Sequence, residues 1–233
     1  MRATWCHSET VTTWAVIVAA GSGDRFGRPK QFEQLGDRRV VDWAISAARE
    51  ACDGTVLVVP EGWTGDDSAC AAVDAVASGG TTRSDSVRAG LAQVPADADV
   101  VVVHDAARPG APAELFESVI DAVAAGAEAA VPGLPVADTI KTVDAAGGGP
   151  VPGARRVNGT IDRSQLVAVQ TPQAFRASSL RAVHANGGQA TDDAALVEEA
   201  GGLVVVVAGL AQAHKITAPH DITLVAAMLG IDP

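Results

Sequence analysis

Runs of apolar residues alternate with amphipathic segments along most of this chain. The runs are rich in valine and lack polar alternation, which is typical of parallel strands buried on both faces of a sheet. We expect these strands at Ala15–Ala20, Thr55–Val59, Val100–His104, Ala127–Val131 and Leu203–Val207. Helices are predicted at Val40–Cys52, Asp66–Val76, Ser84–Gln93, Pro112–Ala125, Ser178–Ala185, Asp192–Ala200 and Pro219–Met228. This alternation predicts an α/β fold of three layers, α/β/α, with a mostly parallel sheet and right-handed crossovers.

One segment departs from the alternation. Between Pro132 and Gln170 there is no helical pattern, glycine and proline are frequent, and Asp138–Val143 and Leu166–Val169 are strand-like. We therefore expect an antiparallel β-arm at about residues 135–170 that leaves the main sheet. Three arginines within it favour a functional role: Arg155, Arg156 and Arg163. Residues 1–13 are polar and are expected to form a loose tail, and residues 14–233 to form one domain.

Composition narrows the class of protein. The 233 residues are 48% hydrophobic, enough for one sizeable core, and no apolar run approaches the ~20 residues of a membrane span. The net charge of −11 argues against nucleic acid or an anionic membrane as a partner. Three widely separated cysteines suggest neither a disulfide framework nor a zinc site, so we expect a cytoplasmic protein.

A glycine loop follows the first predicted strand. Residues 19–23 read Ala-Ala-Gly-Ser-Gly, and Arg25 and Lys30 come soon after. Backbone N–H groups in such a turn bind anions, and two nearby cations would neutralise a polyphosphate. Neither the P-loop motif nor the dinucleotide fingerprint fits, because Phe26 stands where the latter needs glycine. The glycines alone are equally consistent with a turn that binds no ligand.

Further short motifs follow in a fixed order. They are Gly79–Val87, Val103–Pro109, Asp138–Lys141, Thr160–Arg163, Gln170–Gln173, Thr191–Asp193 and the segment around Lys215. Each has a simple structural explanation: Ser86 suits a loop–helix junction, Asp105 and Arg108 suit an ion pair, and Thr191–Asp193 suits a helix cap. Only three lysines occur in the chain, and Lys30 and Lys215 both stand in these motifs or beside the glycine loop, which favours phosphate binding.

Taken together, these motifs closely resemble those of the 2-C-methyl-D-erythritol 4-phosphate cytidylyltransferase family, from about Trp14 to Leu229. The resemblance implies a Rossmann-like nucleotidyltransferase that joins CTP to 2-C-methyl-D-erythritol 4-phosphate and releases pyrophosphate. It further implies a requirement for Mg²⁺ or another divalent cation. In this family the β-arm embraces a second subunit, so a homodimer with composite active sites is expected.

The resemblance also assigns roles to individual residues. Arg25 and Lys30 would stabilise charge on the phosphates of CTP, and Arg163 and Lys215 would position the phosphate of the second substrate. The CTP-binding residues would be Ala19, Ala20, Gly21, Gly23, Arg25, Lys30, Gly80, Ser86, Asp105 and Ala106. The second substrate would meet Asp105, Arg108, Thr139, Arg163, Thr171, Thr191 and Lys215. Asp105 is the candidate metal ligand, and Thr139 and Arg108 are expected to come from the partner subunit. Thr81 stands where some relatives carry aspartate.

Four other functions are considered. A cytidylyltransferase for another alditol phosphate, such as ribitol 5-phosphate, shares the first loop, but its relatives vary in two motifs that are intact here. A sugar-nucleotide pyrophosphorylase would use UTP or GTP instead of CTP. A catalytically inactive nucleotide-binding protein is disfavoured by the presence of Arg25, Lys30, Arg163 and Lys215. An NAD-dependent dehydrogenase is disfavoured by the position of Gly27.

Overall fold

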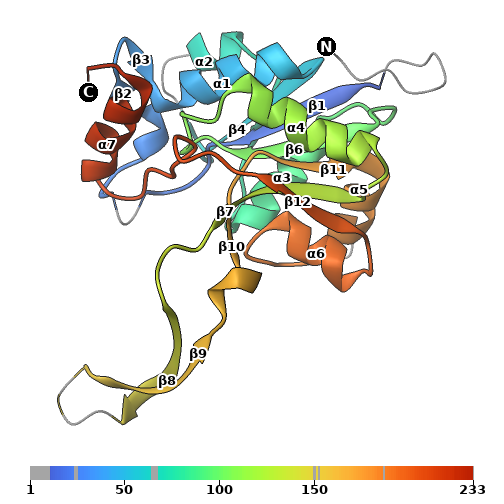
Figure 1. The fold of residues 1–233 in the computed structure, drawn as a ribbon. Coiled ribbons are helices and arrows are strands. Elements are labelled where there is room, and N and C mark those ends of the chain that lie inside the picture. Colours follow the sequence, from blue (N-terminus) through green and yellow to red (C-terminus); the bar gives the residue numbers. More distant parts are fainter. Residues whose placement is uncertain are drawn as a thin grey trace.

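A computed structural model describes residues 11–23, 26–63, 68–148, 151, 153–185 and 187–232. Its centre is a mostly parallel sheet of eight strands in the order β10-β7-β11-β6-β1-β4-β5, with β12 paired to β7 (Figure 1). The strands are β1 Thr13–Val18, β4 Gly54–Val59, β5 Ala75–Ser78, β6 Val100–Asp105, β7 Ala129–Pro135, β10 Val167–Val169, β11 Gln173–Arg176 and β12 Val204–Ala208. The expected α/β fold is confirmed.

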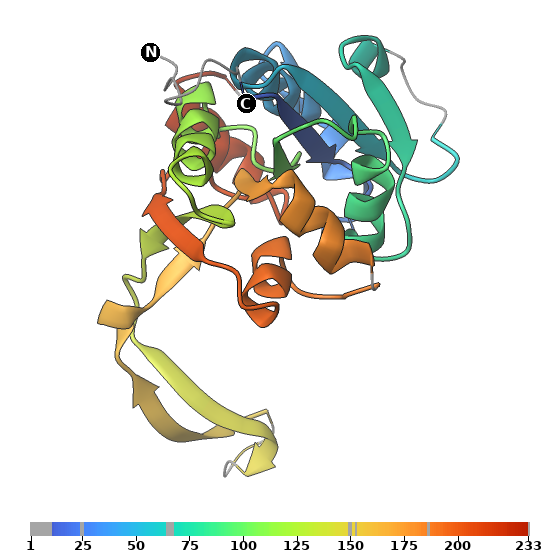
Figure 2. The same ribbon diagram turned by 90° about the vertical axis from the view of Figure 1, so that its right-hand side faces the viewer.

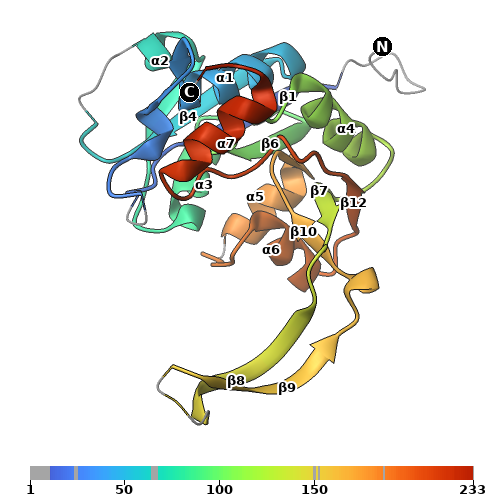
Figure 3. The same ribbon diagram turned by 60° about the vertical axis from the view of Figure 1, so that its left-hand side comes forward.

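Helices cover both faces of the sheet (Figure 3). One face packs against α1 (Val40–Ala51) and α4 (Ala113–Ala124), and the other against α3 (Arg83–Leu91), α5 (Ala177–Ala185) and α6 (Asp193–Glu199). Successive strand residues point to opposite faces, so Ile17 joins the first core and Val16 the second. Both side chains are fully buried, which explains the continuous apolar runs in the sequence.

A smaller core joins the C-terminal helix to the segment after the glycine loop. The helix α7 (His220–Leu229) lies beside the hairpin of β2 (Gln34–Leu35) and β3 (Arg38–Arg39), as Figure 1 shows. Leu35 and Val225 are fully buried in this core, together with Ile216 from the segment before α7. The helix η1 (Lys30–Phe32) precedes the hairpin. None of the helices in the described part of the chain has the length and apolar character of a membrane span.

Two parts of the sheet differ from the prediction. The helix predicted at Asp66–Val76 is wrong over most of its described part, because α2 covers only Ser68–Ala71 and the chain then enters β5. Parallel pairing of β5 with β4 overrides the local helical pattern of this alanine-rich segment. The four-residue strand β11 was not predicted, and it pairs antiparallel with both β6 and β7. The other predicted helices agree with the structure to within two residues at either end.

The β-arm projects from the body as a separate two-stranded sheet (Figures 1 and 2). Its strands are β8 (Ile140–Gly148) and β9 (Arg155–Ile161), which pair antiparallel. The second strand differs from the expected one: Leu166–Val169 overlaps β10, which pairs with β7 in the main sheet and not with the first arm strand. A short helix, η2 (Arg163–Gln165), links β9 to β10.

Candidate functional site

A cavity of about 410 Å³ opens at the carboxyl edge of the sheet. Val18 is paired with Val58 of β4 and Asp105 of β6, so these strands end side by side. Ligands of α/β sheets bind beyond this edge. The lining residues are Val18, Ala19, Ala20, Gly21, Ser22, Lys30, Gln31, Gly80, Thr81, Thr82, Arg83, Ser86, Asp105, Ala107 and Lys215.

The glycine loop is held in place by Gln31, whose side chain is buried. Its Nε2 donates hydrogen bonds to the carbonyl oxygens of Ala19, at 2.6 Å, and Gly21, at 3.0 Å. Gly23 has a φ of +76°, and a Cβ there would lie 1.9 Å from the carbonyl oxygen of Arg28, so only glycine fits. A Cβ on Gly21 would meet nothing within 4 Å, which leaves space beside this turn.

A second loop forms the opposite wall and leads into α3. The Ser86 hydroxyl donates to the Thr82 carbonyl at 3.0 Å and accepts from the Gly80 N–H at 3.2 Å. Thr82 caps α3 through a capping box with Asp85. A Cβ on Gly79 would lie 2.2 Å from the Cβ of Ala20, so this glycine lets the two loops approach. The predicted CTP-binding residue Ser86 therefore also shapes the loop.

Between the two loops lies a group of charged side chains. Asp105 accepts one hydrogen bond from Lys215 Nζ at 2.7 Å through Oδ2 and another from Arg83 Nε at 3.2 Å through Oδ1. Burial opposes ionisation of Asp105, but the positive charges of Arg83 and Lys215 outweigh it and hold its pKa well below the usual range. Asp105 is thus ionised, and the Lys215 side chain keeps 37% of its surface exposed.

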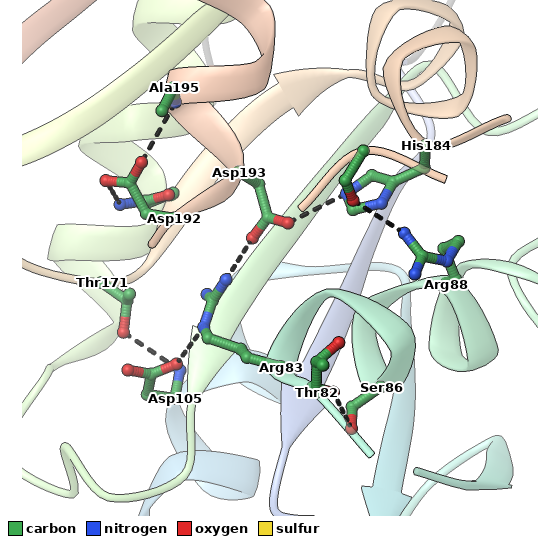
Figure 4. A network of polar contacts seen from close by, with 12 residues as sticks. Thr82, Arg83, Ser86, Arg88, Asp105, Thr171, His184, Asp192, Asp193 and Ala195 are labelled. Atoms are coloured by element: carbon green, nitrogen blue, oxygen red, sulfur yellow. Dashed lines mark hydrogen bonds and ion pairs between the residues drawn. The ribbon is translucent and has the colours of Figure 1, made fainter. Parts of the chain in front are cut away.

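Arg83 also contacts buried side chains that do not line the cavity. Its Nη1 donates to Asp193 Oδ2 at 2.6 Å, and the other oxygen of Asp193 accepts from His184 Nε2 at 2.9 Å (Figure 4). Burial alone would lower the pKa of Arg83, but Asp105 and Asp193 raise it overall, so Arg83 keeps its charge. The cavity therefore holds a fixed guanidinium that the sequence analysis did not assign to it.

Two residues predicted to bind the second substrate, Arg108 and Thr171, make hydrogen bonds within the protein. Arg108 donates to the carbonyl oxygen of Ala213 at 2.8 Å, and Thr171 Oγ1 accepts from the Asp105 N–H at 3.0 Å. Thr171 Oγ1 also lies 3.1 Å from Nδ1 of His104. Burial lowers the pKa of His104 to about 3, so its ring is neutral. Neither Arg108 nor Thr171 lines the cavity.

Three further predicted residues, Thr139, Arg163 and Thr191, lie apart from the cavity-lining residues. Thr139 and Arg163 are exposed on the arm and its root, and Arg163 donates to the Ala137 carbonyl. Thr191 is exposed just before α6. Gly23 and Ala106 lie beside the cavity-lining residues but do not line it themselves, and Arg25 lies outside the described residues. The predicted residues that line the cavity are Ala19, Ala20, Gly21, Lys30, Gly80, Ser86, Asp105 and Lys215.

Three functional candidates were missed by the sequence analysis: Gln31, Arg83 and Asp193. Arg83 and Asp193 stand inside motifs noted above, and Gln31 follows Lys30 directly, but none could be assigned because its role depends on distant partners. Gln31 binds backbone 10 and 12 residues away, and Arg83 binds Asp193, 110 positions along the chain. The available sequence signal was that each of the three is a polar residue beside or close to a predicted site residue.

The described residues do not build a metal site in the cavity. No group of three or more histidine, cysteine, aspartate or glutamate side chains suited to a metal occurs in the part of the chain that the structure describes. Among the described residues that line the cavity, Asp105 is the one carboxylate, and both of its oxygens accept hydrogen bonds from cationic groups. A metal ion on Asp105 would share its oxygens with Arg83 and Lys215.

Comparison with known proteins gives consistent matches. The family model described as "IspD: 2-C-methyl-D-erythritol 4-phosphate cytidylyltransferase" matches residues 13–230. A 2-C-methyl-D-erythritol 4-phosphate cytidylyltransferase of Nocardia farcinica is 45% identical over 224 residues, covering 92% of this chain and 93% of the relative. The crystal structure of such an enzyme from Thermus thermophilus superposes with a TM-score of 0.76 at 33% identity, covering 93% of this chain and 98% of the other.

Proposed function

The chain belongs to the 2-C-methyl-D-erythritol 4-phosphate cytidylyltransferase family, and from this premise we propose how its cavity serves the family's reaction. The enzyme is a nucleotidyltransferase that transfers a cytidylyl group from CTP to 2-C-methyl-D-erythritol 4-phosphate in isoprenoid precursor synthesis. The observation that carries the proposal is the meeting of the glycine loop, Lys30 and the Asp105–Lys215 pair in one cavity.

Charge neutralisation is the main task of the site. A phosphate oxygen of the second substrate attacks the α-phosphorus of CTP, a new P–O bond forms, and the bond to pyrophosphate breaks. Two anions must meet, so fixed positive charge lowers the barrier most. We assign this charge to Lys30 on the CTP side and Lys215 on the side of the second substrate, within a chain of net charge −11. Roles for Arg25 and Arg163 remain predictions.

The two loops suit a nucleotide between them. We propose that the backbone of residues 19–21 and Gly23 receives the phosphates of CTP. Gly80 and Ser86 would lie beside the base and ribose. The close contact between Gly79 and Ala20 supports this arrangement, because it fixes the distance between the two loops. Asp105 is the last residue of β6, and Ala106 follows it. Asp105 would contact sugar hydroxyls through the oxygen that Arg83 or Lys215 releases.

The divalent cation is proposed to be held by the nucleotide itself. Mg²⁺ in phosphate sites keeps several waters and needs few protein ligands. The described residues offer no metal cage, and Asp105 is engaged by Arg83 and Lys215. The family assignment is consistent with a divalent cation, and we derive no catalytic step from it.

We further propose a homodimer formed through the β-arm. An isolated two-stranded sheet is marginally stable in water, so β8 and β9 need a surface to cover them. Val157 on the arm is 54% exposed, and Val167 and Val206 near its root are 43% and 53% exposed. A partner's arm on this surface would bury these side chains. It would also bring Thr139 and Arg163 toward the cavity of the other subunit.

Arg108 differs from Thr139 and Arg163 because it lies on the body of the protein and not on the arm. It follows β6 by three residues, and its side chain donates to the Ala213 carbonyl at 2.8 Å, in the segment that carries Lys215. We propose that it supports that segment within its own subunit and also reaches the second substrate. Thr171 would act in the same region by holding the backbone of Asp105. A cytoplasmic location remains a prediction from cysteine usage.

Pyrophosphate release with a panel of substrates tests the function. We expect turnover with CTP and 2-C-methyl-D-erythritol 4-phosphate, and little with UTP, GTP or ribitol 5-phosphate. Lys30→Ala and Lys215→Ala are each expected to lower kcat/KM about 100-fold, since one lost charge contact is worth ~3 kcal/mol in such transition states. Turnover only with another substrate pair would overturn the substrate assignment, and no turnover with any pair would favour an inactive nucleotide-binding protein. Normal kinetics in both variants would overturn the roles given to Lys30 and Lys215.

A further inference from the structure

A chain of hydrogen-bonded polar side chains runs from the helix layer into the cavity. His184 on α5 donates to Asp193 at the start of α6, and Asp193 accepts from Arg83 on α3. Arg83 donates to Asp105 at the end of β6, and Asp105 accepts from Lys215. Figure 4 shows the first four of these side chains joined end to end. Residues from five separate parts of the chain thus meet in one network.

Asp193 is buried more deeply than a helix cap requires. Its side chain has no exposed surface, although the N-cap of α6 is already supplied by Asp192, whose Oδ1 accepts from the Ala195 N–H at 3.0 Å. A buried carboxylate is costly unless its partners satisfy it, and here each oxygen has one. Neither Asp193 nor His184 lines the cavity, whereas Arg83 does. Of the two hydrogen-bond partners of Asp193 described above, Arg83 is therefore the one that connects it to the cavity.

The geometry of Arg83 explains what this contact achieves. A guanidinium presents its donors in a rigid plane and prefers to bind both oxygens of one carboxylate. Asp193 anchors Nη1 at 2.6 Å, and in this orientation Arg83 reaches Asp105 through Nε at the longer distance of 3.2 Å, while its buried Nη2 has no hydrogen-bond partner among the described residues. This leaves Oδ2 of Asp105 free to accept from Lys215 at 2.7 Å. Without Asp193, Arg83 would compete with Lys215 for Oδ2.

We propose that Asp193 is a positioning residue that restrains Arg83 and thereby reserves one oxygen of Asp105 for Lys215. His184 supports this role by donating from Nε2 to the other oxygen of Asp193, while its Nδ1 has no hydrogen-bond partner among the described residues. The inference rests on the proposed function, because Lys215 must act on the second substrate for its position to matter.

Asp193→Asn tests the proposal, with Asp192→Asn as the matched control. Asparagine keeps the shape of the side chain but removes the charge that holds Arg83. We expect kcat/KM for 2-C-methyl-D-erythritol 4-phosphate to fall about tenfold or more, and the Kd of CTP alone to change less than threefold. Asn serves as well as Asp at an N-cap, so Asp192→Asn is expected to stay within twofold of the wild type.

A double variant separates positioning from a general structural effect. If Asp193 acts through Lys215, then Asp193→Asn adds less than twofold to the loss in Lys215→Ala. Full multiplication of the two losses, or normal kinetics in Asp193→Asn, would overturn the inference. If Asp193→Asn fails to fold, the same measurements are made on His184→Gln. This variant removes the imidazole that donates to Asp193 and keeps the charges of Asp193 and Arg83. Failure of the proposed function is distinct, because the wild type itself would then not convert these substrates.

Discussion

At the scale of single residues, the site depends on side chains that fix backbone as much as on those that carry charge. Gln31 is the clearest case, because its amide binds two carbonyls of the glycine loop and is itself buried. Ser86 acts similarly on the second loop. The two loops are therefore held by the protein's own hydrogen bonds, and at the proposed CTP site this preorganisation would reduce the entropy lost on binding.

Gln31→Ala should loosen this loop. Two carbonyls lose a donor, and an unsatisfied buried polar group costs about 1–3 kcal/mol, so we expect the free energy of unfolding to drop by about that amount. The Kd of CTP should rise about tenfold, measured by calorimetry. Gln34→Ala is the control, because Gln34 is exposed and donates only to the nearby Gly36 carbonyl. Equal CTP affinity in both variants would show that Gln31 does not shape the site.

The same scale marks the limit of sequence reasoning. Asp105 and Lys215 were each predicted to belong to the site, because Asp105 ends a recognisable strand and Lys215 precedes a recognisable helix. In the structure, Lys215 Nζ lies 2.7 Å from Asp105 Oδ2. Arg83 and Asp193 were not assigned, since pairing across 110 positions leaves no local pattern. Arg108 and Thr171 were expected to contact substrate, and local sequence gave no sign that they also bind the protein's own backbone.

At the scale of elements, the segment before α7 determines where Lys215 lies. Asp221 Oδ2 accepts from the N–H groups of Thr217 at 2.7 Å and Ala218 at 2.8 Å, and so ties this segment to the helix start. Burial opposes ionisation of Asp221, but these hydrogen bonds outweigh it and hold its pKa well below the usual range. The segment is also anchored by Ile216, which is fully buried.

Asp221→Asn should therefore change stability in a pH-dependent way. The carboxylate has a lower pKa in the folded state than in the unfolded state, so its stabilisation is complete above the ordinary value of 3.8 and is lost below it. At pH 7 the variant should be about 1.5–3 kcal/mol less stable, as expected for hydrogen bonds to a charged group. In urea titrations this difference should shrink from pH 6 to pH 3.

The exposed Asp37 provides the control for this measurement. Its side chain is 82% exposed, so Asp37→Asn should leave stability nearly unchanged at every pH. A constant gap between the wild type and Asp221→Asn from pH 6 to pH 3 would contradict the argument. A gap that closes on acidification would support it.

Elements were predicted well where local pattern and tertiary contacts agree. The central strands are fully buried on both faces, and their apolar runs identified them. The segment that forms β5 looked helical because its alanines suit a helix, but pairing with β4 decides its structure. The strand β11 is too short to show a pattern, and its burial comes from β6 and β7.

At the scale of the whole molecule, the β-arm separates predicted site residues from the cavity. Thr139 and Arg163 lie on or beside the arm, and neither lines the cavity of its own subunit. The sequence pattern predicted an arm but not its direction, because an extended hairpin without a core takes its position from what it contacts. A dimer with shared sites would place Thr139 and Arg163 at the cavity of the partner subunit.

Mixing two inactive variants tests whether the sites are shared. Arg163→Ala and Lys215→Ala should each be nearly inactive alone. In a mixed dimer, the intact cavity of the first receives the intact arm of the second, so co-expression should restore about a quarter of wild-type activity. Activity no greater than that of the separate variants would place Arg163 and Lys215 in the same site of one subunit. Sedimentation should confirm that each variant is dimeric.

The central claim is that one cavity, lined by the glycine loop, Lys30 and Lys215, receives the triphosphate of CTP. A crystal structure of the enzyme with CTP and Mg²⁺ tests it most directly. We predict the phosphates between residues 19–23 and the two lysine ammonium groups, with the base beside Gly80. Density for CTP at any other place on the molecule, with this cavity holding only solvent, would contradict the account.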